Sequence, residues 1–233
     1  MSLHSRRTAL GWLLSALALL APWAPAQEST PRPNILFIMT DDHAAHAISA
    51  YGSRVNQTPH IDRLAEQGAL FRNCFVTNSI CAPSRAVILT GRYSHLNGVI
   101  DNASCFDGHQ TTFPRLLQQA GYQTAVIGKW HLYSDPVGFD HWEVIDNVME
   151  QGTYYNPVFR SPRGEEASSG YVADLVTDKA IAWLDKSMRK NSAQAGQGSA
   201  PFFLIYNHKT PHRDWLPGPQ ELRAWDEDER VPE

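Results

Sequence analysis

One cysteine lies in a segment whose residue types suit the capture of an anion. The run Cys81-Ala82-Pro83-Ser84-Arg85 is followed by Leu89-Thr90-Gly91-Arg92. We predict a short helix over residues 83–90, stopped by Gly91. The free N–H groups and the dipole of a helix N-terminus attract anions. This position, with Arg85 one turn along, is expected to lower the thiol pKa of Cys81. The segment therefore predicts a nucleophile that faces an anionic substrate.

Two adjacent carboxylates, Asp41 and Asp42, follow an apolar run. Neighbouring side chains of a regular strand point to opposite faces, so both can reach one ion only if the strand has already ended. Without a cation the two carboxylates repel each other and one pKa rises. A hard divalent metal ion, Ca²⁺ or Mg²⁺, explains the pair. The alternative is a turn at a strand end, in which an aspartate caps a helix.

Two further motifs combine lysine with histidine. They are Gly128-Lys129-Trp130-His131 and His208-Lys209-Thr210-Pro211-His212. Taken alone, each is explained by a solvated loop lysine and a packed histidine. Together with Cys81 and the two aspartates, they predict a single catalytic site.

The elements that must position these motifs alternate between strands and helices. Apolar runs predict strands at residues 35–39, 69–77, 123–127 and 202–206. Helical spacing and end signals predict helices at residues 59–67, 83–90, 112–120 and 172–188. We expect residues 35–39 to form a buried central strand, Thr58 to cap the first helix, and residues 191–200 to form a surface loop. This order predicts an α/β fold with a largely parallel sheet. Polar motifs follow strands at residues 40, 128 and 207, so the carboxyl ends of the strands are expected to bring them together.

The motif set resembles the sulfatase family of the alkaline phosphatase superfamily. Cys-x-Pro-Ser-Arg, Thr-Gly-Arg and Gly-Lys-x-His all occupy family spacing, and the resemblance covers residues 33–216. It implies a mixed, mostly parallel central sheet flanked by helices. It also implies that a formylglycine-generating enzyme oxidises Cys81 to formylglycine (3-oxoalanine), whose hydrate supplies an oxygen nucleophile. Ca²⁺ and Mg²⁺ prefer oxygen to thiolate, so this modification suits the predicted metal.

The resemblance implies hydrolysis of sulfate esters, on sulfated carbohydrates or on aryl sulfates. It assigns catalytic roles to Cys81, Arg85, Lys129, His131 and His212. It assigns metal binding to Asp41, Asp42 and the modified Cys81, and substrate binding to Lys129, His208, Lys209 and His212. In this scheme Lys129 holds a sulfate oxygen, and His131 binds the nucleophile's hydroxyl or takes its proton. His212 protonates the leaving alcohol or contacts sulfate.

The chain departs from the family pattern after His212. The family's second acidic pair and second catalytic lysine have no counterpart before Glu233. We therefore expect residues 27–233 to be the N-terminal portion of a sulfatase catalytic domain, and this chain alone to bind metal weakly and to be poorly active. Three alternatives remain open at this point: a phosphatase or phosphonate hydrolase of the same superfamily, an inactive glycan-binding remnant, and a thiol hydrolase that uses Cys81.

Composition and the N-terminal segment indicate an exported protein. The net charge of −4 argues against nucleic-acid binding through bulk charge, so local cations must capture any anionic substrate. Residues 1–26 resemble a signal peptide, with Arg6-Arg7, an apolar run from Ala9 to Ala21, and Ala24-Pro25-Ala26 as the cleavage site. Secretory and twin-arginine export both fit, and the apolar run is short for a stable membrane span. We expect a periplasmic or secreted product, in which Cys74 and Cys105 could pair.

Overall fold

The computed structural model describes residues 32–145, 151–193 and 200–223. The predicted signal peptide lies outside the described residues, as does most of the predicted loop at residues 191–200. Residues 191–193 of that loop extend the preceding helix. No helix among the described residues has both the length and the apolar character that crossing a bilayer requires.

A six-stranded sheet forms the centre of the unit that begins at Pro33. Its strands, in spatial order, are β1 (Ile35–Met39), β6 (Phe202–Asn207), β2 (Gln123–Gly128), β3 (His141–Val144), β4 (Val158–Ser161) and β5 (Gly164–Ala167). The first four are parallel to one another, β4 pairs antiparallel with β3, and β5 pairs antiparallel with β4. The predicted mixed, mostly parallel sheet is confirmed.

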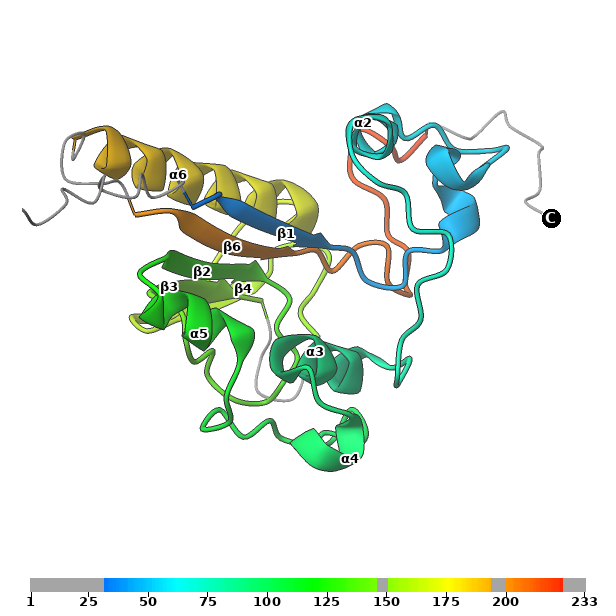
Figure 1. Cartoon of the computed structure of the whole chain (residues 1–233). Coiled ribbons are helices and arrows are strands. Elements are labelled where there is room, and N and C mark those ends of the chain that lie inside the picture. Colours follow the sequence, from blue (N-terminus) through cyan, green and yellow to red (C-terminus); the bar gives the residue numbers. More distant parts are fainter. Residues whose placement is uncertain (1–31, 146–150, 194–199, 224–233) are drawn as a thin grey trace, which may run out of the picture. The chain divides into compact units, whose positions relative to one another are not determined.

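Helices cover both faces of this sheet, which gives three layers (Figure 1). The long helix α6 (Val172–Ala193) lies on one face, and α3 (Cys81–Thr90) and α5 (Phe113–Gln119) lie on the other. Successive side chains of each strand point to opposite faces of the sheet. Val126 packs on the side of α3, whereas Ala125 and Ile127 pack on the side of α6. The remaining short helices are η2 (Ala45–Ala47), η3 (Ser49–Tyr51), α2 (Pro59–Gln67) and α4 (Ser94–Asn97).

Two strand predictions differ from the structure. Among the described residues, β1 pairs only with β6 and forms an edge of the sheet, with Leu36 47% and Ile38 50% exposed. An apolar run alone cannot distinguish an edge strand from a central one, because the position depends on whether other strands pair with it on one side or on both. The strand predicted at residues 69–77 is absent: Phe71 and Phe75 are exposed and the backbone pairs with no strand of the sheet. The segment has the apolar pattern of a buried strand, but Phe71 and Phe75 stay exposed.

The helix boundaries follow from local chemistry. Helix α3 begins at Cys81, two residues earlier than predicted. Its first turn tolerates Pro83, because the N–H that proline lacks would have no partner within the helix at that position. It ends at Gly91 in the left-handed conformation, whose N–H donates to the Val87 carbonyl. Thr58 precedes α2 as predicted but makes no capping hydrogen bond. Its hydroxyl instead donates to the Asp62 carboxylate.

Candidate active site

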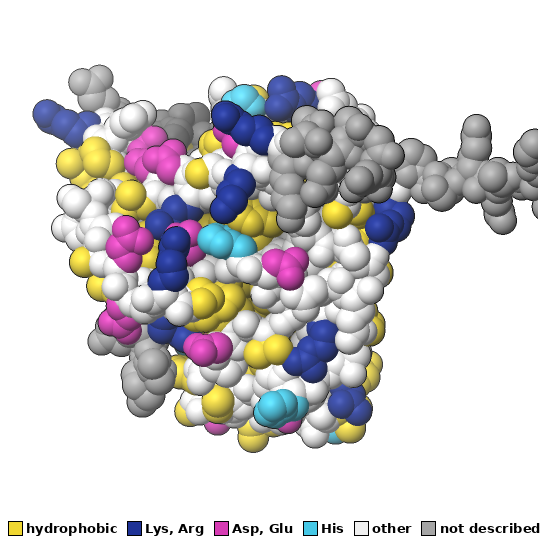
Figure 2. Space-filling model, turned by 90° about the vertical axis from the view of Figure 1, so that its left-hand side faces the viewer, with side chains coloured by type: hydrophobic (Ala, Val, Ile, Leu, Met, Phe, Trp, Pro, Cys, Tyr) yellow, Lys and Arg dark blue, Asp and Glu magenta, His cyan; other side chains and the backbone are white. Residues whose placement is uncertain are grey.

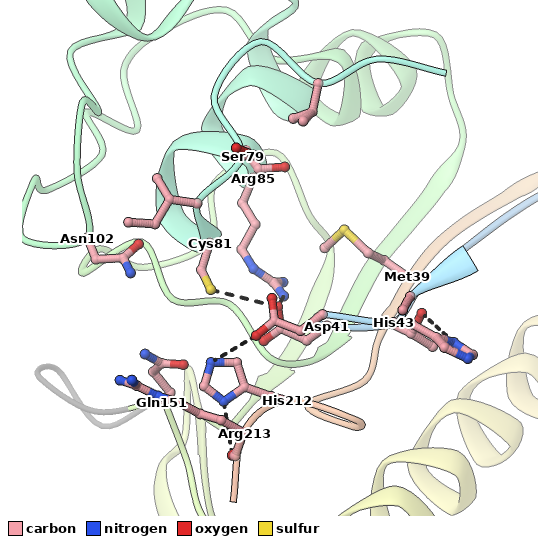
Figure 3. Close-up of a pocket in the computed structure, with 16 residues that line it drawn as sticks. Met39, Asp41, His43, Ser79, Cys81, Arg85, Asn102, Gln151, His212 and Arg213 are labelled. Carbon is pink, nitrogen blue, oxygen red and sulfur yellow. Dashed lines mark hydrogen bonds and ion pairs between the residues drawn. The ribbon is translucent and has the colours of Figure 1, made fainter. Parts of the chain in front are cut away.

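The predicted motifs meet at the carboxyl ends of the parallel strands (Figure 3). Asp41 follows β1, Lys129 follows β2, and His212 lies in the segment after β6. The Asp41 N–H donates to the Thr210 carbonyl (3.1 Å), which ties two of these segments together. Helix α3 brings Cys81, its first residue, to the same place.

Asp41 is the centre of the arrangement. It is 6% exposed, its Oδ2 contacts the Lys129 ammonium, and its Oδ1 lies 3.7 Å from Arg85 Nη2. Burial alone would raise the pKa of Asp41, but Arg85 and Lys129 outweigh it and hold the pKa below its usual value. A carboxylate ionised at neutral pH therefore lies between two buried cations.

Three side chains could share a metal ion. The ligand atoms of Asp41, Cys81 and His212 all lie within 4.8 Å of one another. The Cys81 Sγ lies 3.8 Å from Asp41 Oδ1. Carboxylate and oxygen donors suit Ca²⁺ or Mg²⁺, whereas a thiol does not. Asp41 fits a hard ion together with residue 81 once that residue presents oxygen in place of sulfur, whereas the His212 imidazole is not a typical ligand of such an ion.

Asp42 stands apart from that group. Strand β1 ends at Met39, so the pair follows the strand end as predicted. Asp42 has a φ of 57°, and its side chain is 56% exposed. Its Oδ2 lies 3.6 Å from His212 Nε2. The structure thus turns Asp42 toward His212, and its role as a metal ligand stays a prediction.

The predicted low thiol pKa of Cys81 is wrong. Burial raises the pKa of the Cys81 thiol and outweighs the opposite effects of Lys129 and Arg85, and the nearby Asp41 raises it further. An unmodified thiol at this position stays neutral, and a neutral thiol is a weak nucleophile. This environment counts against the thiol-hydrolase alternative.

Lys129 is completely buried and held at both ends. Its Nζ contacts Asp41 and donates to Gln151 Oε1 (2.7 Å). Its backbone carbonyl accepts hydrogen bonds from Arg85 Nη1 (2.8 Å) and Asn207 Nδ2 (3.0 Å). Burial lowers the pKa of Lys129, with Arg85 acting in the same direction and Asp41 against it.

The two histidines assigned catalytic roles are both buried. Burial, with Lys129 and Arg85, lowers the pKa of His131 to about 4, so its imidazole is neutral at neutral pH. Burial also lowers the pKa of His212. The Tyr154 hydroxyl donates to the His212 carbonyl and fixes the segment after β6. His212 lines the cleft, whereas His131 is buried and is not among the lining residues.

Lys209 and His208, the two predicted substrate-binding residues that precede His212, lie in different surroundings. Lys209 is 5% exposed, and its Nζ lies 5.2 Å from the centre of the Tyr154 ring. Burial is the main cause of the lowered pKa of Lys209, and Asp41 and Cys81 act in the opposite direction. His208 packs against the ring of Tyr206 at 4.4 Å. Neither lines the cleft, so their roles in substrate binding stay predictions.

A cleft of about 790 Å³ opens over this cluster. Two of its lining residues were missed by sequence reasoning. Asn102 accepts the Ala82 N–H (2.9 Å) at the start of α3, and Gln151 contacts Lys129. No pattern in the sequence points to Asn102 or to Gln151 as a residue of the site.

Comparison with known proteins agrees with this geometry. The sequence model of the sulfatase family matches residues 33–229. An N-acetylglucosamine-6-O-sulfatase of Bacteroides thetaiotaomicron is 51% identical over 209 residues, which cover 90% of this chain and 36% of that protein. A mouse N-acetylgalactosamine-6-sulfatase is 30% identical, over 86% of this chain and 43% of that protein.

A solved structure shows the same likeness in three dimensions. It is described as a complex with its substrate, D-glucosamine-2-N,6-O-disulfate. The TM-score is 0.79 at 49% identity, over 87% of this chain and 39% of that chain. The chain thus spans between 36% and 43% of the length of these relatives. On the family match, the sequence identity and the shared fold, this chain belongs to the sulfatase family.

Proposed function

We propose that the whole protein hydrolyses sulfate esters of glycans, at the 6-O position of an N-substituted glucosamine. The single observation that carries this proposal is the group formed by Asp41, residue 81 and His212, within 4.8 Å and beside two buried cations. The relative that is 51% identical bears the name of a sulfatase for that sugar position, which supports the substrate class.

The nucleophile in this proposal is formylglycine, made from Cys81 by a formylglycine-generating enzyme. A Ca²⁺ ion, or Mg²⁺ in its place, would be held by Asp41, Asp42 and the hydrated residue 81. When bound, the ion neutralises charge on the sulfate oxygens. The raised thiol pKa supports this proposal, because cysteine itself is a poor nucleophile and a poor ligand for such an ion here.

The residues of the site then divide the reaction. One hydroxyl of the residue-81 hydrate gives its proton to His131, which is neutral at neutral pH, and forms a bond to sulfur as the sulfur–oxygen bond to the sugar breaks. Lys129 and Arg85 stabilise charge near the sulfate oxygens, and His212 gives a proton to the leaving alcohol. His212, having given up its proton, then accepts the proton of the second hydroxyl. The aldehyde re-forms as sulfate leaves, and water hydrates it again.

We also propose that residues 1–26 are a signal peptide and that the mature protein is periplasmic or secreted. The paired arginines, the apolar run and the small residues before Gln27 support this proposal. N-terminal sequencing of the exported protein would show Gln27 as the first residue. An unprocessed N-terminus in the exported fraction would contradict it.

Sulfate release from matched substrates tests the proposed activity. The whole protein, co-expressed with a formylglycine-generating enzyme and supplied with Ca²⁺, is incubated with N-acetylglucosamine 6-O-sulfate and with the 6-phosphate of the same sugar. We expect sulfate release, loss of it in Cys81→Ala, and little phosphate release. Preference for the phosphate ester would favour the phosphatase alternative. Sugar binding without release of either anion would favour the glycan-binding one.

A further inference from the structure

The backbone carbonyl of Lys129 joins the three elements that build the site. It accepts one hydrogen bond from Arg85 of α3 and one from Asn207, the last residue of β6. Lys129 itself directly follows β2. Its buried carbonyl is therefore fixed from both the nucleophile helix and the sheet.

Asn207 holds both main-chain groups of Lys129. The Asn207 carbonyl accepts the Lys129 N–H (3.0 Å), and the Asn207 Nδ2 donates to the Lys129 carbonyl (3.0 Å). The turn between them is tight: Gly128 has a φ of 103°, and a Cβ there would lie 1.9 Å from the Asn207 carbonyl oxygen. Asn207, which is 4% exposed, thus fixes the direction in which the chain leaves β2.

The carboxamide of Asn207 can take only one orientation. A carbonyl accepts and never donates, so the NH₂ group must face Lys129. The Oδ1 atom then points away, and no protein atom among the described residues donates to it. Asn207 also borders a small cavity whose other lining residues are mostly apolar, among them Phe37, Ile88 and Ile205. A leucine would suit that space better, so packing alone does not explain an asparagine here.

We infer that Asn207 is a positioning residue that places the Lys129 ammonium beside Asp41 and the transferred sulfate. This inference rests on the proposed function, because it needs Lys129 to contact sulfate. Asn207 touches no reacting atom itself. It acts through the main chain of Lys129, whose carbonyl accepts hydrogen bonds from both Asn207 and Arg85. Small displacements of a positioned group lower catalysis strongly while leaving the fold intact.

The test compares Asn207→Leu, at the last residue of β6, with a control variant that removes a hydrogen bond to the first residue of β6. Asn34 Oδ1 accepts the N–H of Phe202, the first residue of β6 (3.0 Å). Asn34→Ala thus removes one hydrogen bond to β6 far from the cleft. We expect kcat of Asn207→Leu to fall about tenfold, KM to change less than about threefold, and Asn34→Ala to keep its kcat. Asn207→Asp, which keeps the size but cannot donate, should lose kcat as well.

Hydrogen exchange separates failure of this inference from failure of the proposed function. Amides of residues 128–132 should exchange faster in both Asn207 variants and at the wild-type rate in Asn34→Ala. If the wild type releases no sulfate, the proposed function fails and the exchange rates alone judge the role of Asn207. Unchanged exchange at residues 128–132, or a wild-type kcat in Asn207→Leu, would overturn the inference. An equal loss of kcat in Asn34→Ala would do so too.

Discussion

At the scale of single residues, the site is a buried carboxylate compensated by two cations. Asp41 stays ionised only because Arg85 and Lys129 offset the effect of its burial. The balance is the opposite at Cys81, where burial and the nearby aspartates outweigh Lys129 and Arg85 and the thiol stays neutral. The sign of each shift depends on the balance between desolvation and neighbouring charge.

Replacing Lys129 separates catalysis from stability. In Lys129→Met, kcat should fall by about 100-fold or more, because a donor aimed at developing charge is lost. The variant should be less stable, because Asp41 loses one of the two cations that offset its burial, but Arg85 remains beside it and the fold should persist. Steady-state kinetics and thermal unfolding of the variant measure both effects.

The control for that variant is Lys179→Met. Lys179 is paired with Glu143 on the α6 side of the sheet and is absent from the cleft. It should lose stability without losing kcat. Equal kinetic losses in the two variants would argue against a catalytic role for Lys129.

At the scale of elements, the strand ends were predictable and the neighbours of each strand were not. Apolar runs bounded by polar motifs correctly located β1, β2 and β6, and with them Asp41, Lys129 and His212. The edge position of β1 depends on β6, which lies more than 160 residues away in the sequence. Asn207 was likewise missed, because its importance comes from a tertiary contact with Lys129.

A separate ion cluster outside the cleft joins β3 to α6. Glu143 of β3 pairs with Lys179 of α6 and with His141. Figure 2 shows one face of the molecule, on which basic and acidic side chains lie interspersed. The hydrogen bond from His141, helped by Lys179, lowers the pKa of Glu143 to about 2, although burial opposes it.

This cluster predicts a pH dependence of stability. The folded-state pKa of Glu143 lies below its usual value of 4.5. The stabilisation is therefore complete above about pH 4.5 and is lost as the pH falls through about 2. At neutral pH it amounts to at most about 2–3 kcal/mol. Glu143→Gln should be less stable than the wild type near neutral pH, and the gap should narrow on acidification. Denaturant unfolding at several pH values measures it, and a constant gap would contradict the assignment.

At the scale of the whole molecule, the proposed capture of an anionic substrate relies on the placement of cations rather than on net charge. The chain carries a net charge of −4, yet Arg85, Lys129 and Lys209 are all buried at the same end of the sheet. Sequence motifs and their spacing predicted that these groups converge, because parallel strands deliver their carboxyl ends to one edge. They could not predict which groups line the cleft: His212 does, whereas His131 and His208 do not.

The mass of the peptide that contains residue 81 tests the central claim most directly. After co-expression with a formylglycine-generating enzyme, the account predicts a mass about 18 Da below that of the cysteine form, as conversion of a thiol to an aldehyde requires. A residue 81 that remains a thiol or forms a disulfide under these conditions would contradict it.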